Sequence, residues 1–190
     1  MQRRSHKNTH ETRGPVSCRN MLARFLICMP VALTGCSASV PPSDAHQLLG
    51  QSPEPRREAT LGGPLIDVPA RERVTIVDFW STSCAPCRGL MPKIERIRES
   101  LSPRGLVVIG VARDDNPGMV QEMVRTLGIH YPIVIDDGSR VAGAYRVGPV
   151  LPQTFVVGRD GRIRFVRVGA HEGDDEKAIE SAAIRALEGQ

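Results

Sequence analysis

The sequence predicts an α/β domain in which helices cover both faces of a mixed central sheet. Two observations carry this prediction: β-branched apolar runs alternate with amphipathic runs, and the last two apolar runs flank an Asp-Gly turn. The composition agrees with one globular domain, because 41% of the 190 residues are hydrophobic and 24% are charged.

The first half of the domain is expected to hold two buried strands, each followed by a helix. The runs "VTIVDFW" (residues 74–80) and "LVVIGVA" (residues 106–112) are rich in β-branched residues, as is typical of strands buried on both faces. Helical spacing after the first run places five apolar residues on one face: Leu90, Met91, Ile94, Ile97 and Leu101. After the second run, Asn116-Pro117 supplies an N-cap and a first-turn proline, and Gly128 follows the last apolar residue of the helix.

The second half of the domain adds three shorter strands and two helices. The run "YPIVID" (residues 131–136) predicts a short strand, and residues 139–145 suit a short helix. Residues 153–169 read as two strands joined by the Asp-Gly turn, which is a strong hairpin signal. Residues 174–187 form a closing helix, so the predicted order is β-α-β-α-β-α-β-β-α.

The net charge of +4 comes from the N-terminus alone. Residues 1–36 hold six of the 25 basic residues and one of the 21 acidic residues, so the remainder carries 19 basic and 20 acidic residues. Residues 37–190 are therefore nearly neutral and have no excess of positive charge that would attract nucleic acid. We expect no nucleic-acid partner.

The N-terminus has the features of an export signal. Basic residues precede an apolar stretch, Phe25–Leu33, that is too short to span a bilayer, and "LTGC" then resembles a bacterial lipobox. We interpret residues 1–36 as a lipoprotein signal peptide whose Cys36 is lipidated, with Met21 as a possible translation start. The chain would then be lipid-anchored in the bacterial cell envelope, facing the periplasm or the exterior. An ordinary signal peptide and a buried apolar segment are the alternatives.

Residues 37–60 are rich in Ser, Pro and charged residues, which predicts a flexible tether before a domain spanning residues 61–190. Cys18 and Cys28 would leave with the signal peptide, and Cys36 would carry lipid. Only Cys84 and Cys87 then remain as thiols, in the motif "CAPC".

These two cysteines lie where a strand gives way to a helix. Backbone N–H groups and the helix dipole at that point stabilise an anion, and a thiolate is the nucleophile of disulfide exchange. Cys84 is placed to attack, and Cys87, one turn later, to resolve a mixed disulfide. A metal site would need two further ligands, whereas His130 and His171 stand alone, so no metal is expected. Two inert buried thiols remain a weaker alternative.

The segment "VDFWSTSCAPCRGLMP" resembles the active site of the thioredoxin superfamily. The later "LPQTFVVGRDGRI" resembles the segment that carries the cis-proline of that superfamily. The chain is most similar to the membrane-tethered TlpA/ResA/CcmG group, which shares an extra strand-helix segment between these two motifs. The resemblance runs from about Leu61 to the C-terminus, and it implies a thioredoxin-like three-layer sandwich.

The resemblance also implies roles for individual residues. A cis Leu151–Pro152 bond would turn the backbone toward Cys84, leaving groups that pair with a substrate chain. Asp78 would accept the Cys87 proton, directly or through water, although a structural carboxylate bonded to its neighbours is the alternative. Trp80 would contact the substrate beside the disulfide, with a role in the core as the alternative.

The expected function is that of an extracytoplasmic thiol–disulfide oxidoreductase that reduces protein disulfides, with cytochrome c maturation as one setting. No cofactor is needed, because the dithiol itself carries two electrons. The resemblance implies a membrane electron donor of the DsbD/CcdA type, and we expect a monomer. A disulfide-forming oxidase of the same fold and a non-catalytic lipoprotein binding module are alternatives. A thiol peroxidase is disfavoured, because the Pro and Thr expected before its cysteine are missing.

Overall fold

The computed structural model describes residues 44–114, 116–171 and 174–189. The predicted signal peptide and its lipid-anchor residue, Cys36, lie outside these residues. In the part that is described, no helix is both long enough and apolar enough to cross a membrane.

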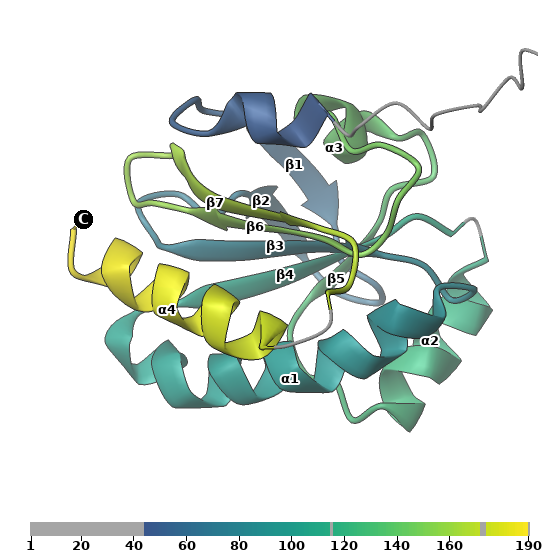
Figure 1. The fold of residues 1–190 in the computed structure, drawn as a ribbon. Coiled ribbons are helices and arrows are strands. Elements are labelled where there is room, and N and C mark those ends of the chain that lie inside the picture. Colours follow the sequence, from purple (N-terminus) through teal and green to yellow (C-terminus); the bar gives the residue numbers. More distant parts are fainter. Residues whose placement is uncertain (1–43, 115, 172–173, 190) are drawn as a thin grey trace, which may run out of the picture. The chain divides into compact units, whose positions relative to one another are not determined.

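A five-stranded sheet with the order β5-β4-β3-β6-β7 forms the centre of the fold (Figure 1). Its middle strand, β3, is buried along its whole length, as its β-branched sequence predicts. On one side β4 and β5 continue the sheet in parallel, and on the other β6 and β7 follow in antiparallel order. The strands are β3 (Thr75–Trp80), β4 (Val107–Ala112), β5 (Ile133–Ile135), β6 (Gln153–Val157) and β7 (Ile163–Val168).

Each face of this sheet is covered by a different set of helices (Figure 1). Alternation along β3 sends Ile76 and Trp80 into one apolar cluster, and Val77 and Phe79 into the other. The first cluster packs under α1 (Ala85–Leu101), α2 (Pro117–Thr126) and α4 (Asp175–Leu187), and the second under the 3-10 helix η1 (Asp44–Leu48) and α3 (Arg140–Ala144). A short 3-10 helix, η2 (Ser102–Arg104), follows α1. The predicted three-layer α/β sandwich is thus confirmed.

The ordered domain begins earlier than the predicted boundary at Leu61. Ahead of it lie η1 and the strand β1 (Arg56–Ala59), which pairs antiparallel with β2 (Leu65–Val68). The side chain of Leu48 is buried in the second cluster, and Glu58 of β1 binds Arg140 of α3 at 2.8 Å. This part of the predicted tether is therefore packed, because its few apolar and charged side chains have partners far away in the sequence.

Replacement of Leu48 tests this boundary. Leu48→Ala should lower the free energy of unfolding by about 2–4 kcal/mol, since the side chain is 4% exposed in the core. Leu49→Ala is the matched control, because its neighbouring side chain is 49% exposed, and it should change stability by about 0.5 kcal/mol or less. Urea unfolding of both variants measures the difference, and equal, small effects would restore the tether interpretation.

Candidate active site

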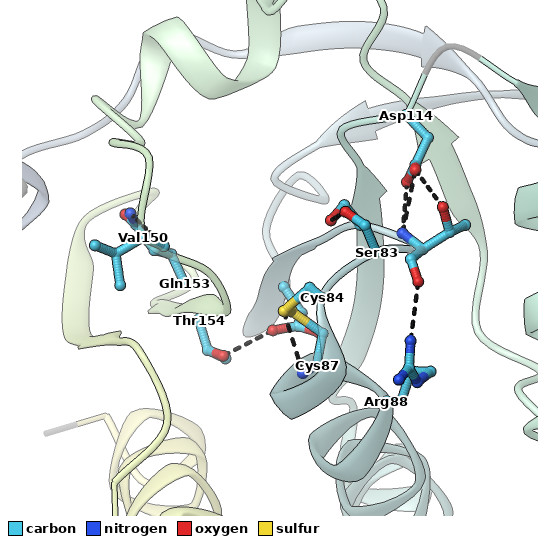
Figure 2. The surroundings of a disulfide bond; sticks show 11 residues. Ser83, Cys84, Cys87, Arg88, Asp114, Val150, Gln153 and Thr154 are labelled. Atoms are coloured by element: carbon cyan, nitrogen blue, oxygen red, sulfur yellow. Dashed lines mark hydrogen bonds between the residues drawn. A yellow bond between two sulfur atoms is a disulfide. The ribbon is translucent and has the colours of Figure 1, made fainter.

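The cysteine pair lies at the N-terminus of α1, where the sequence places it. Cys84 is the N-cap of the helix, and its Sγ accepts the backbone N–H of Cys87 at 3.2 Å. The two cysteines form a disulfide with an S–S distance of 1.97 Å (Figure 2). Cys84 is partly exposed, whereas Cys87 is completely buried. The pair therefore has one partly exposed cysteine and one buried cysteine.

The loop before Cys84 is fixed by a residue that sequence reasoning missed, Asp114. Its carboxylate accepts the backbone N–H of Thr82 at 2.9 Å and the Thr82 hydroxyl at 2.6 Å. The Arg88 guanidinium donates to the Thr82 carbonyl at 3.2 Å, so Arg88 is a structural donor here. Figure 2 shows Arg88 and Asp114 on opposite sides of the loop that leads to Cys84. A polar residue directly after a buried strand was the signal that could have pointed to Asp114.

A second loop approaches the pair from β6. The Leu151–Pro152 bond is cis, as the resemblance implied. The Gln153 amide donates to the Val150 carbonyl at 2.7 Å and closes this loop on itself. Leu151 and Ser83 both line a cleft of about 460 Å³ that also contains the charged Arg113, Asp114, Asp136 and Asp137. The cis-proline loop and the CxxC loop thus meet at one polar cleft.

Asp78 lies on the sheet face that α1 covers. It sits between Ile76 and Trp80 on β3, and both of these residues belong to the apolar cluster that contains Cys87. One of its oxygens, Oδ1, accepts the Thr154 hydroxyl at 2.7 Å, and Figure 2 shows Thr154 pointing toward the cysteine pair. Complete burial raises the pKa of Asp78 to about 7, although the Thr154 hydrogen bond acts to lower it. The carboxyl is therefore able to take up or release a proton near neutral pH.

The predicted substrate-binding role of Trp80 is not supported by its position. Its side chain is 0% exposed and packs in the cluster between the sheet and α1. This position fits the alternative, a role in the core. Of the three residues predicted to bind substrate, Leu151 remains partly exposed, and Pro152 is buried.

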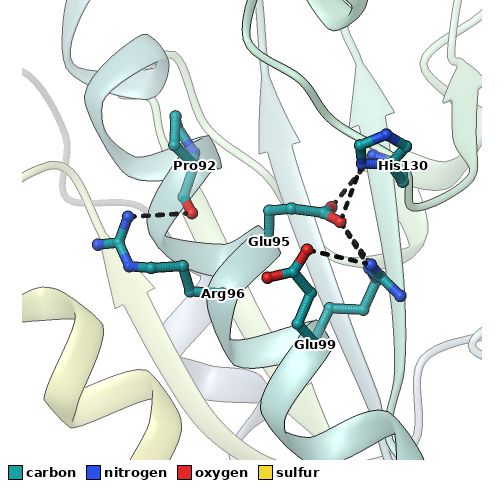
Figure 3. A network of polar contacts seen from close by, with 6 residues as sticks. Pro92, Glu95, Arg96, Glu99 and His130 are labelled. Atoms are coloured by element: carbon teal, nitrogen blue, oxygen red, sulfur yellow. Dashed lines mark hydrogen bonds and ion pairs between the residues drawn. The ribbon is translucent and has the colours of Figure 1, made fainter.

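A polar network connects α1 to the segment before β5 (Figure 3). Glu95 of α1 accepts the Arg98 guanidinium at 2.6 Å and the His130 backbone N–H at 3.1 Å. Partial burial acts to raise the pKa of Glu95, but the hydrogen bonds from Arg98 and His130 outweigh it and hold that pKa below its usual value. The carboxylate is thus ionised at neutral pH and fixes the segment that continues into Tyr131.

Comparison with known proteins agrees with this geometry. A family model described as the AhpC/TSA family matches residues 64–166, which include Asp78, both cysteines and Pro152. The chain belongs to the AhpC/TSA family.

Curated relatives of this AhpC/TSA-family chain include proteins named thiol-disulfide oxidoreductase ResA. The protein of Bacillus anthracis is 32% identical over 87 residues, or 46% of this chain and 50% of that protein. The protein of Halalkalibacterium halodurans is 35% identical over 104 residues, or 55% of this chain and 57% of that protein. The chain thus matches little more than half the length of these relatives. The matches confirm the resemblance to the TlpA/ResA/CcmG group.

Solved structures share the fold of this AhpC/TSA-family chain. StoA from Bacillus subtilis superposes with a TM-score of 0.60 at 20% identity, covering 68% of this chain and 96% of StoA. A thioredoxin-family thiol:disulfide interchange protein from Chlorobium tepidum gives a TM-score of 0.62 at 23% identity, covering 72% and 95% of the two chains. At these identities the comparison establishes the thioredoxin-like fold.

The buried carboxyl makes a prediction about stability and pH. Because the pKa of Asp78 is about 7 in the folded protein and near 4 when exposed, the unfolded chain releases the proton first, and stability falls as the pH rises from about 4 to 7. Asp78→Asn removes the free-energy cost of burying a charged carboxylate and should stabilise the oxidised protein by about 2–4 kcal/mol at pH 8. Urea unfolding at pH 8 and pH 4 measures the gain, which should vanish at the lower pH. A gain of equal size at both values would refute the assignment.

Proposed function

We propose that the chain is an extracytoplasmic thiol–disulfide oxidoreductase that reduces disulfides in proteins. The observation that carries this proposal is the Cys84–Cys87 disulfide at a helix N-terminus, with Cys84 partly exposed and Cys87 buried. The names of the ResA relatives support the reaction class, and the cleft beside Ser83 and Leu151 provides room for a substrate segment.

The reaction starts from the reduced dithiol. The Cys84 thiolate, stabilised by the N-terminal N–H groups of α1, attacks a substrate disulfide and releases one substrate thiolate. Cys87 then loses its proton to the Asp78 carboxylate, and its sulfur attacks Cys84 Sγ, expelling the second substrate thiolate. Two electrons pass to the substrate, and the Cys84–Cys87 disulfide of this structure is the product.

Two partners complete the proposed cycle. The backbone beside the cis Leu151–Pro152 bond pairs with an extended substrate segment next to its disulfide, and a haem-binding Cys-x-x-Cys-His peptide of cytochrome c maturation is a suitable substrate. A membrane thiol donor of the DsbD/CcdA type returns the two electrons to the disulfide. The protein acts as a monomer that needs no cofactor.

The cysteine roles are tested with insulin as the substrate and dithiothreitol as the reductant. Cys84→Ser should lower insulin reduction to the uncatalysed rate, because the attacking sulfur is lost. Cys87→Ala should instead accumulate a mixed disulfide on Cys84, visible by mass spectrometry, because nothing resolves it. Wild-type turnover by Cys84→Ser would reject the catalytic role and favour a binding module.

We also propose that Cys36 carries lipid and holds the domain at the surface of a bacterial membrane. The supporting observation is the order of basic residues, short apolar stretch and "LTGC" at the N-terminus. Cys36→Ser should move the protein from the membrane to the soluble fraction of cells. Cys18→Ser is the matched control and should leave it in the membrane; identical fractionation of both variants would contradict the anchor.

A further inference from the structure

Three buried polar atoms on the α1 side of the sheet have no hydrogen-bond partner among the described residues. They are Asp78 Oδ2, Trp80 Nε1 and the Tyr131 hydroxyl oxygen, and the three side chains are at most 2% exposed. A buried donor or acceptor without a partner costs about 1–3 kcal/mol, so three such atoms in one region call for an explanation.

Two of these side chains, Trp80 and Tyr131, approach Gly110 of β4, and Asp78 is the neighbour of Gly110 on the adjacent strand. Gly110 pairs with Asp78 in the parallel β3–β4 register, and Trp80 lies two residues after Asp78 on the same face. A Cβ atom at Gly110 would lie 2.6 Å from Ile133 Cδ1, 3.0 Å from Tyr131 Cε2 and 3.2 Å from Trp80 Nε1. The missing side chain of Gly110 therefore leaves the space in which the indole N–H and the tyrosine ring approach the strand position beside Asp78.

The chemistry of the three atoms is complementary. The indole and the hydroxyl each provide a donor, and the carboxylate oxygen that Thr154 does not use is an acceptor. Burial first, and then the charges of Asp78 and Glu95, raise the pKa of Tyr131, so its hydroxyl keeps its proton and lies within electrostatic reach of Asp78.

We infer that Tyr131 is a positioning residue for the thiol–disulfide reaction, because its hydroxyl and the Trp80 indole N–H donate, through one buried water, to Asp78 Oδ2. This inference rests on the proposed function, in which Asp78 takes the Cys87 proton. With Thr154 on Oδ1 and these donors on Oδ2, the carboxylate is oriented and its charged form is stabilised.

The surroundings of Asp78 leave few other groups to explain its titration. Titratable side chains on the elements that cover this face include Cys87 and Glu95 of α1, Tyr131 itself and the buried Asp175 of α4, which is paired with Arg167 at 3.1 Å. Glu95 is held by Arg98 and by the backbone of His130, and this contact fixes the residue adjacent to Tyr131. In the oxidised protein Cys87 does not titrate. The His130 imidazole, whose Nδ1 lies 3.4 Å from Glu95, is a second group that can respond to pH, and the Asp78→Asn variant separates its effect from that of Asp78.

Trp80 provides a direct readout, because it is the only tryptophan in the sequence. In the oxidised full-length protein, the resonance of the indole N–H should shift with pH, and the midpoint of that shift should equal the midpoint of the Asp78 titration. Asp78→Asn should abolish the shift. Tyr131→Phe should raise that midpoint by about one pH unit, since losing a donor to the carboxylate favours the neutral acid.

Tyr145→Phe is the matched control. The Tyr145 hydroxyl is also buried without a partner among the described residues, but it lies in the cluster on the opposite face of the sheet. This variant should leave the midpoint unchanged. Three results would overturn the inference. The indole resonance could stay constant through the titration, Tyr131→Phe could leave the midpoint unchanged, or Tyr131→Phe and Tyr145→Phe could change the midpoint equally.

The test does not depend on the proposed reaction. The indole titration is read in the oxidised protein without a substrate, whereas insulin reduction by the wild type reports the function. A normal titration with no insulin reduction would reject the proposed function and with it the positioning role. Reduction of insulin by a protein whose indole resonance does not change with pH would reject the positioning role of Tyr131 alone.

Discussion

The burial of one carboxyl, Asp78, in the central strand is the constraint around which the site is arranged. A charge in this position is costly, and the fold reduces the cost with a hydrogen bond from the Thr154 hydroxyl of β6. The same sheet face carries α1, whose N-terminus holds Cys84 and whose first turn buries Cys87. Asp78, which changes charge near neutral pH, and Cys87, whose buried thiol must lose a proton, thus lie in the same layer between the sheet and α1. This is the arrangement that the proposed proton transfer requires.

The parts of this arrangement that are local in sequence could be predicted from it. The β-branched run of β3, the cysteine spacing and the Asp-Gly hairpin each determine their structure within a few residues, and the cis Leu151–Pro152 bond followed from the family resemblance. The missed features depend on distant partners. Glu58 meets Arg140 across 82 residues, and Asp114 meets Thr82 across 32, so neither partner can be identified from the segment that contains the carboxylate. The complete burial of Trp80 could not be predicted for a related reason, because alternation assigns the side chain a face but does not say how deeply that face is covered.

The charges near the cysteine pair bear on the direction of electron flow. A strongly stabilised Cys84 thiolate makes a dithiol oxidising, and here the helix N-terminus is the main source of such stabilisation. The two residues between the cysteines, Ala85 and Pro86, carry no charge, and the guanidinium of Arg88 is engaged by the Thr82 carbonyl. An ionised Asp78 in the adjacent layer opposes a thiolate. These features together favour the disulfide over the dithiol, which is the property of a reductant.

The reduction potential of the Cys84–Cys87 pair is therefore the most direct test of this account. It is obtained by equilibrating the protein with defined ratios of reduced and oxidised dithiothreitol or glutathione and quantifying the free thiols after acid quenching. The account predicts a value nearer to thioredoxin, at about −270 mV, than to the oxidant DsbA, at about −120 mV. A value close to that of DsbA would contradict the account, because it would show that the fold stabilises the dithiol and that the protein accepts electrons from its substrates.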